Sequence, residues 1–350
     1  MKGQAGVLAL LLVLALPCNV SAREEGGGKP IVGAPQQRRG EASRLAERLK
    51  TAKIADAATQ YALGLDYRNG HGVPQDAAQA YKWIHLAAVN NLAEAQFTIG
   101  QMDAAGEGAP RHSNDAADWF RKAAKQGHLG ATLALAGMYR KGEGMLVDFT
   151  QAARYYRIAA DRDDIQSQLT LGEFYLRGEG VTMSADDAAV WFRRAAQLGS
   201  AEARYRLALL LLDGDPATQR SHRPSHNSVE ALTWLQWAAD QGYAPAQFSL
   251  GMAYYAGIIA PRDRATVLSL INCAADHGDT AALRQLASFY RAGRLTSKDP
   301  VRALMYLELA VQLGDRRAQR ERDLLSRDLP PAQQQTARKR ASEWAQMRTL

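Results

Sequence analysis

The chain has 350 residues, 47% apolar and 23% charged, which predicts an ordered protein long enough for two ordinary domains or one elongated array. Its net charge of +7 comes from the two ends: residues 316–350 hold nine Arg and Lys against four Asp and Glu, and residues 23–56 hold eight against five. The stretch between them is slightly acidic, so we expect no nucleic-acid binding through a cationic body.

Residues 1–22 have the features of a secretory signal peptide. Lys2 gives a positive start, an apolar run covers 7–16, and Val20-Ser21-Ala22 supplies the small residues at which a signal peptidase cuts. The run is too short to span a bilayer, which takes about 20 residues, so we expect no transmembrane segment. Cleavage after Ala22 would give a periplasmic or secreted protein, or one in the endoplasmic reticulum lumen if the source were eukaryotic.

Two cysteines bear on the fate of the exported chain. Cys18 offers the alternative of a lipid anchor, although Pro17 immediately before it fits that signal poorly. Once the signal is removed, Cys273 is the only cysteine, so stability must come from packing and not from a disulfide framework. Residues 23–40, rich in Gly, Pro and Gln, are expected to form a flexible linker.

An internal repeat dominates residues 57–315. A small residue recurs at steps of 36 residues, with one step of 43, and an alanine pair keeps the same spacing. The small residues are Gly64, Gly100, Ala136, Gly172, Ala208, Gly251 and Ala287. A fixed period in this range predicts a solenoid of seven stacked units, over 57–92, 93–128, 129–164, 165–200, 201–243, 244–279 and 280–315.

Each unit is expected to contain two helices. In the first helix the small residue lets the second helix approach closely, and a glycine six residues later ends the helix in the left-handed conformation. These glycines are Gly70, Gly106, Gly142, Gly178, Gly214, Gly257 and Gly293. The second helix is expected to begin at a capping side chain, namely Asp76, Asp148, Ser184, Asn227, Asp263 or Asp299, with His112 as the exception.

Gly178-Glu179-Gly180, taken alone, has the composition of a phosphate-binding turn. Equivalent pairs occur at Gly70-His71-Gly72, Gly106-Glu107-Gly108 and Gly142-Glu143-Gly144, and no lysine follows Gly180 as a phosphate partner. A phosphate loop has no reason to recur once per helix pair. We therefore interpret the glycine pair as a helix stop followed by a tight turn.

The pattern LG-x-x-Y-x-x-G-x-G-V, then D-x-x-x-A-x-x-W-x-x-x-AA-x-x-G, resembles the Sel-one-like repeat, a relative of the tetratricopeptide repeat. Residues 171–199 match it nearly throughout, and the fifth unit matches it least. The resemblance implies an all-α solenoid, a right-handed superhelix of about seven helix-turn-helix repeats that binds proteins or peptides. Family members serve as envelope adaptors, as regulators of exopolysaccharide or motility, and as subunits of lumenal degradation complexes.

The two ends of the array are expected to be capped. Residues 41–56 align with a degenerate second helix, and residues 316–350 form the C-terminal capping helices. Terminal units of a solenoid need a polar outer face, which accounts for the surplus of cations at both ends without a ligand.

No catalytic or metal-binding motif stands out, so we expect no enzyme activity, no cofactor and no metal. The chain lacks S-x-x-K, H-E-x-x-H and C-x-x-C. His222 and His226 are the one suggestive pair, but Pro224 lies between them, and no cysteine or nearby acid completes a zinc site. They belong to an insertion loop, Asp213–Ser228, that either shapes a binding face or is a neutral extension.

The first helices carry a second apolar row opposite their core stripe. If that face lines a superhelical groove, Met102, Met138, Phe174, Leu210 and Phe289 form an adaptable ladder for a peptide or an amphipathic helix. Their polar neighbours on the same face are Gln101, Lys141, Glu173, Arg177 and Arg206. The alternative is that the ladder packs between successive first helices.

These observations predict an exported, non-enzymatic scaffold or adaptor that binds a protein or peptide partner in its groove, for envelope assembly, regulation or host interaction. The alternative is an envelope enzyme, or the accessory subunit of one, acting on peptidoglycan, β-lactams or exopolysaccharide. Association with polysaccharide or peptidoglycan also stays open.

Overall fold

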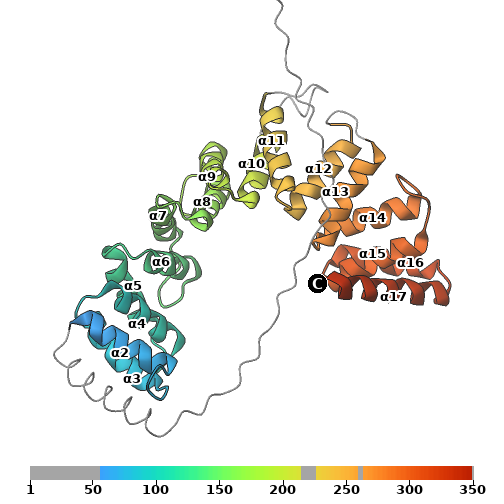
Figure 1. Ribbon diagram of the computed structural model, residues 1–350. Helices are drawn as coiled ribbons and strands as arrows, with labels where there is room; N and C mark the ends of the chain where they lie inside the picture. Colours follow the sequence, from blue (N-terminus) through green and yellow to red (C-terminus); the bar gives the residue numbers. More distant parts are fainter. Residues whose placement is uncertain (1–55, 214–225, 259–262, 349–350) are drawn as a thin grey trace, which may run out of the picture. The chain divides into compact units, whose positions relative to one another are not determined.

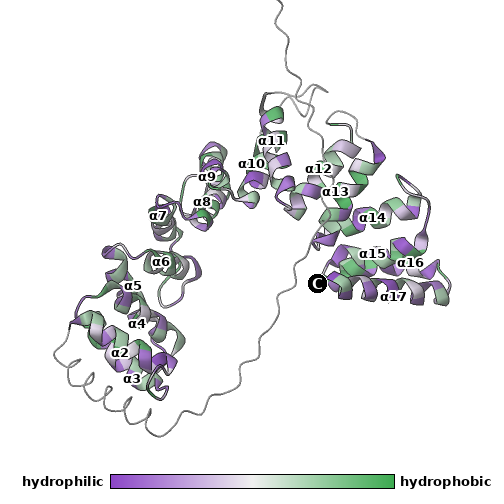
Figure 2. Ribbon diagram, in the orientation of Figure 1, coloured by the Kyte–Doolittle hydropathy of each residue, from purple (hydrophilic) through white to green (hydrophobic). Residues whose placement is uncertain are grey.

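The computed structural model describes residues 56–213, 226–258 and 263–348, in which sixteen α-helices and no strand form (Figure 1). The predicted signal peptide, the linker and all but the last residue of the N-terminal cap lie outside the described residues, as do residues 214–225 of the insertion loop. Hydrophilic and hydrophobic residues alternate along the labelled helices (Figure 2). Among the described helices there is none with the length and hydropathy that crossing a membrane requires.

The described chain falls in two compact units, divided between Ala246 and Gln247. The N-terminal unit contains α2 (Ala57–Asn69), α3 (Ala77–Val89), α4 (Ala93–Ala105), α5 (Ser113–Lys125), α6 (Leu129–Lys141), α7 (Phe149–Ala160), α8 (Ile165–Arg177), α9 (Ala185–Gln197), α10 (Ala201–Asp213) and α11 (His226–Asp240). The C-terminal unit contains most of α12 (Ala244–Tyr255), then α13 (Arg264–Asp276), α14 (Thr280–Ala292), α15 (Pro300–Gln312), α16 (Arg316–Arg327) and α17 (Pro331–Arg348).

The helices pack as pairs in chain order. Contacts join α2 to α3, α4 to α5, α6 to α7, α8 to α9, α10 to α11 and α14 to α15. In the N-terminal unit, each second helix also packs against the first helix of the next pair, as α3 does against α4 and α9 against α10. In the C-terminal unit, α15 is covered by the capping helices α16 and α17. The predicted all-α architecture of stacked helix pairs is confirmed.

Where the small residue of the first helix is glycine, the second helix of the pair approaches it closely. A Cβ added at Gly64 would lie 2.5 Å from Cγ1 of Ile84, and one added at Gly100 would lie 2.7 Å from Cε1 of Phe120. The same clash arises at Gly172, where a Cβ would overlap the ring of Phe192 in α9. The helices of a pair therefore approach as closely as a missing side chain allows, as the sequence predicts.

The glycine pairs are architectural. The first glycine ends the first helix: Gly70, Gly106, Gly142, Gly178 and Gly293 have φ between 68° and 74°, and each donates its N–H to the carbonyl four residues earlier. The second glycine lies against the preceding repeat, because a Cβ at Gly180 would clash with the carbonyl of Phe149. Gly257 also has a positive φ, and Gly214 lies outside the described residues.

Most of the predicted helix caps are present. The side chains of Asp76, Asp148, Ser184, Asp263 and Asp299 each accept a hydrogen bond from a backbone N–H in the first turn of a second helix. His112 makes no such bond. Asn227 lies within α11, which begins at His226, but its side chain lies outside the described residues, so its role as a cap stays a prediction. Asp164 and Asp279 cap first helices in the same way, although the repeat pattern did not predict them as caps.

Buried glutamines four residues before the small residue tie the second and fourth repeats to the repeats before them. Nε2 of Gln96 donates to the carbonyl of Ala88 at 3.1 Å, near the end of α3, and Nε2 of Gln168 donates to the carbonyl of Ala160 at 3.0 Å, at the end of α7. A hydrogen bond of this kind contributes about 0.5–1.5 kcal/mol. Stacking therefore combines apolar contacts with a repeated polar contact at the helix ends.

Gly172→Ala is expected to lower the free energy of unfolding by about 1–3 kcal/mol, because the added Cβ overlaps Phe192 and overpacked cores lose stability on this scale. Gly137→Ala is the matched control, since a Cβ there meets no atom within 4 Å, and it should raise stability by about 0.5–1 kcal/mol. Urea denaturation of the full chain, followed by circular dichroism, measures both. Equal effects of the two substitutions would contradict the close-contact account.

Candidate functional site

Most of the predicted apolar ladder is enclosed. Met102, Phe174 and Phe289 are at most 2% exposed. The ring of Phe174 packs against Tyr156 in α7, with ring centroids 5.8 Å apart, and Phe289 packs against Tyr255 in α12 at 5.0 Å. The prediction that these three residues line an open groove is therefore wrong. Their position on the first helix faces the preceding repeat, so they fill the seam between repeats.

The other two ladder residues differ from these three. Leu210 in α10 is partly exposed. Met138 in α6 is 6% exposed and contributes to the floor of a pocket. The packing alternative therefore also holds for Met138, which is buried against α5 residues of the preceding repeat such as Phe120, and only Leu210 is partly exposed.

Three of the five predicted polar residues meet in one ion-pair network, which we call the Glu173 network. The Glu173 carboxylate in α8 lies 2.6 Å from Nη1 of Arg206 in α10 and 3.6 Å from Nη2 of Arg177. Arg206 also pairs with Glu202 at 2.7 Å, and Arg177 pairs with Glu179 at 3.7 Å. Surface pairs of this kind contribute about 0–1 kcal/mol, so the network fixes the position of charges more than it stabilises the fold.

Gln101 and Lys141 lie apart from this network. Gln101 is exposed on α4, and the Lys141 side chain is 57% exposed at the end of α6, with Nζ 3.5 Å from Oε1 of Glu143. Together with Arg177, which is 60% exposed, they are the most accessible of the predicted site residues. All five polar residues lie on first helices or at their ends, in the second to fifth repeats of the N-terminal unit.

A pocket of about 290 Å³ is lined mainly by α6, with residues of α5 and one residue of α4, and we call it the α4–α6 pocket. Its lining residues are Ala104, Arg111, Ser113, Phe120, Leu133, Ala134, Gly137, Met138, Lys141 and Glu143. Phe120 and Met138 are buried and form an apolar floor, whereas Arg111 and Lys141 are exposed at the rim. The pocket therefore places an apolar interior beside two cations.

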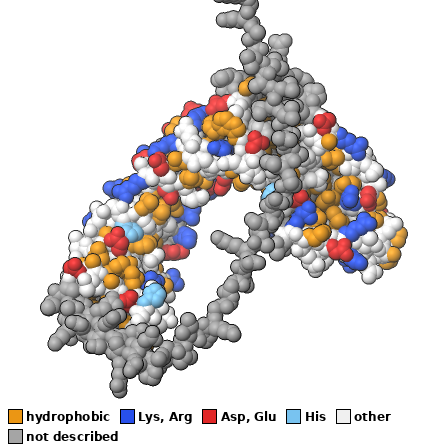
Figure 3. Space-filling model, in the orientation of Figure 1, with side chains coloured by type: hydrophobic (Ala, Val, Ile, Leu, Met, Phe, Trp, Pro, Cys, Tyr) orange, Lys and Arg blue, Asp and Glu red, His pale blue; other side chains and the backbone are white. Residues whose placement is uncertain are grey.

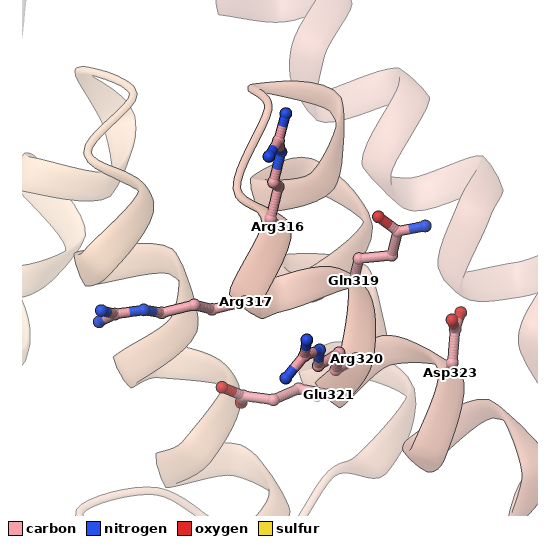
Figure 4. A pocket seen from close by; sticks show the side chains of 6 residues that line it. All are labelled: Arg316, Arg317, Gln319, Arg320, Glu321 and Asp323. Carbon is pink, nitrogen blue, oxygen red and sulfur yellow. The ribbon is translucent and has the colours of Figure 1, made fainter.

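A more open depression of about 790 Å³ lies on α16 in the C-terminal unit. All of its lining residues come from this one helix, and they include Arg316, Arg317 and Arg320. The side chains of Arg316 and Arg317 point away from each other, so these cations do not converge on one point (Figure 4). The surface is the polar outer face that a C-terminal cap requires.

A dyad of titratable side chains joins the first two repeats, because Tyr81 of α3 and Asp103 of α4 contact each other and both have raised pKa values. Asp103 is 1% exposed and accepts a hydrogen bond from the Tyr81 hydroxyl at 2.8 Å, while its Oδ2 has no partner. Burial raises the pKa of Asp103, and burial together with the bond to Asp103 raises the pKa of Tyr81 to about 12. Shifted pKa values often mark functional sites, but the packing around Asp103 gives another explanation.

Asp103 occupies the position that holds an aromatic residue in most repeats. In the third and seventh repeats that aromatic stacks on a ring of its own second helix, with Tyr139 and Tyr155 centroids 5.7 Å apart. In the second repeat the corresponding ring, Trp119, instead meets His85 of the preceding repeat at 5.5 Å. Neither described pocket is lined by the dyad, so we interpret it as an altered packing contact.

No group of three or more His, Cys, Asp or Glu side chains able to hold a metal occurs among the residues that the structure describes. His222, one half of the suggestive histidine pair, lies outside those residues. The arrangement that remains on the first helices is suited to contact with another molecule, through an apolar pocket and charges held in place.

Comparison with known proteins gives one family. The model of the Sel1 repeat matches residues 57–90, 93–128, 130–164, 165–200, 201–243, 244–279 and 280–315. A Sel1 repeat protein from Oxalobacter formigenes has a solved structure that is 28% identical, with a TM-score of 0.68, over 82% of this chain and 81% of that one. No curated protein matches the chain.

Two further solved structures are more distant. The protein c5321, a protective antigen of uropathogenic Escherichia coli strains with an SLR fold, is 23% identical, with a TM-score of 0.46, over 89% of this chain and 84% of its own. The immunity protein Pa5087 from Pseudomonas aeruginosa is 22% identical, with a TM-score of 0.38, over 63% and 81%.

Asp103→Asn is expected to raise the free energy of unfolding at neutral pH, because asparagine keeps an acceptor for the Tyr81 hydroxyl but removes a buried charge. The folded-state pKa of Asp103 lies above its unfolded value near 3.8, so protonation favours the folded state. The advantage of the variant should therefore shrink as the pH falls through that raised pKa. Urea midpoints of both proteins from neutral to acidic pH test this, and a difference independent of pH would count against it.

Proposed function

The chain belongs to the Sel1 repeat family, and we propose that it is an exported scaffold that binds a protein or peptide partner through the first-helix face of its second to fifth repeats. Sel1 repeat proteins usually serve as protein-interaction scaffolds and are in general non-catalytic. The family role is general; what we propose for this chain is its export, the first-helix face as its binding surface, and a protein or peptide as its partner.

The observation that carries the proposal is the α4–α6 pocket and the Glu173 network on successive first helices of one compact unit. The pocket offers apolar surface, and the network holds Arg177 and Arg206 by side-chain contacts that a partner's carboxylate can share. Interfaces combine such a desolvated apolar centre with a polar rim.

The charge distribution supports a protein or peptide rather than a nucleic acid. Acidic, basic and hydrophobic side chains are interspersed over the visible face of the N-terminal unit, without a continuous basic stripe on that face (Figure 3). A strand of nucleic acid needs cations that follow its phosphates, whereas a folded partner or peptide matches a mixed surface.

Export is expected to leave a chain that begins at Arg23, because Val20-Ser21-Ala22 precedes it with the small residues of a cleavage site. Intact-mass measurement of the protein from the extracytoplasmic fraction tests this. A mass that includes a lipid on Cys18 would replace the soluble form with an anchored one. An uncleaved chain found only in the cytoplasm would contradict the export part of the proposal.

The double variant Lys141→Glu/Arg177→Glu is expected to reduce recovery of the cellular partner by about tenfold or more, because charge reversal in an interface costs at least about 1.4 kcal/mol. Both side chains are more than half exposed, so the fold should persist. In-cell crosslinking followed by purification of the full exported chain and mass spectrometry measures the recovery.

The matched control is Lys82→Glu/Arg154→Glu, which reverses one exposed lysine and one exposed arginine on the second helices α3 and α7. This variant should recover the partner as the wild type does. Equal loss in both variants, or loss in the control alone, would place the interface elsewhere. If no partner is crosslinked under any growth condition, the scaffold role itself is contradicted.

A further inference from the structure

Gly137 is an unusual glycine in this fold. It lies in the middle of α6 without a positive φ, a position where glycine weakens a helix relative to alanine. Among the helical glycines of the described residues, it alone has no atom within 4 Å of the place that a Cβ would take. Neither helix packing nor backbone conformation therefore requires a glycine here, in contrast to Gly100 and Gly172.

The space above Gly137 belongs to the α4–α6 pocket. At the equivalent positions of the neighbouring repeats, one residue after the small residue, α4 carries Gln101 and α8 carries Glu173. A side chain of either size at position 137 would take up part of the space of about 290 Å³ that Gly137 lines. The missing side chain therefore leaves that space free.

The chemistry of the pocket is asymmetric. Its interior is apolar, with Phe120, Leu133 and Met138, whereas Arg111 and Lys141 stand at its rim with one acid, Glu143. Glu143 pairs with Lys141 at 3.5 Å, and among the described residues no acid pairs with Arg111. One cation beside the apolar interior is thus uncompensated, which favours an occupant that carries a carboxylate next to an apolar group.

The size of the pocket limits the occupant. Sites for cofactors and drug-sized ligands measure about 300–1,000 Å³, and this one lies at the bottom of that range. It has room for a single large apolar side chain. Peptide recognition commonly works in this way, with one buried anchor and polar contacts around it.

We propose that the α4–α6 pocket anchors an acidic peptide segment of the partner: one large apolar side chain enters over Gly137, and a neighbouring Asp or Glu pairs with Arg111. This inference rests on the proposed function and narrows its partner to a class of sequence. The Glu173 network lies outside the pocket, so its carboxylates and guanidinium groups contact the segment further along or not at all.

Selection from a phage-displayed library of random dodecapeptides on the full exported chain tests the proposal. We expect the enriched peptides to share a large aliphatic or aromatic residue beside an Asp or Glu. Their affinity should fall about tenfold or more for Gly137→Phe, which fills the pocket, and for Arg111→Glu, which reverses the uncompensated charge. Lys82→Phe, which introduces the same side chain at an exposed site of the second helix α3, should leave affinity unchanged.

Thermal unfolding separates loss of binding from loss of fold. Gly137→Phe should unfold at or above the wild-type temperature, because its Cβ meets open space and a helical glycine is removed. Enriched peptides that bind Gly137→Phe as tightly as the wild type, or that lack an acidic residue, would overturn the pocket proposal. A selection that enriches no peptide would overturn it too. None of these results bears on the scaffold function, which the in-cell crosslinking experiment tests separately.

Discussion

The rest of the structure depends on a close contact, made in the first, second and fourth repeats, between the glycine of the first helix and a bulky side chain twenty residues later. Gly64 meets Ile84, Gly100 meets Phe120 and Gly172 meets Phe192. This contact uses one face of the first helix. The residue two positions later fills the seam with the preceding repeat, as Phe174 does against Tyr156. Only the remaining positions of the first helix can meet another molecule.

The candidate site lies at positions of the first helices that neither of these two packing contacts uses. The free positions hold Gln101 in the second repeat, Gly137 in the third and Glu173 in the fourth, and they differ in size and charge although the core beneath them is repeated. Residues at these positions can therefore vary between repeats while the repeated core, and with it the fold, stays the same. In our proposal, function is located in these variable residues, and the α4–α6 pocket lies at one of them, Gly137.

Features that depend on local sequence could be predicted, and features that depend on neighbouring repeats could not. The glycine stops and the caps at Asp76 and Asp148 are set by residues within a few positions of each helix end. The apolar ladder was assigned to the wrong environment because the pattern of one helix shows which residues share a face, but not which neighbour covers that face. The same limit applies to the Glu173 network, whose Arg206 comes from the next repeat, and to the pocket, whose lining comes from the second and third repeats.

The central claim is that the partner contacts the first helices of the N-terminal unit and not the second helices. A photo-crosslinking amino acid placed in the exported protein at Gln101 on α4, or at Arg154 on α7, tests this most directly, because both positions are exposed and each belongs to only one of the two helix sets. The account predicts a covalent adduct with one partner from position 101 and none from position 154. An adduct from position 154 alone would contradict it.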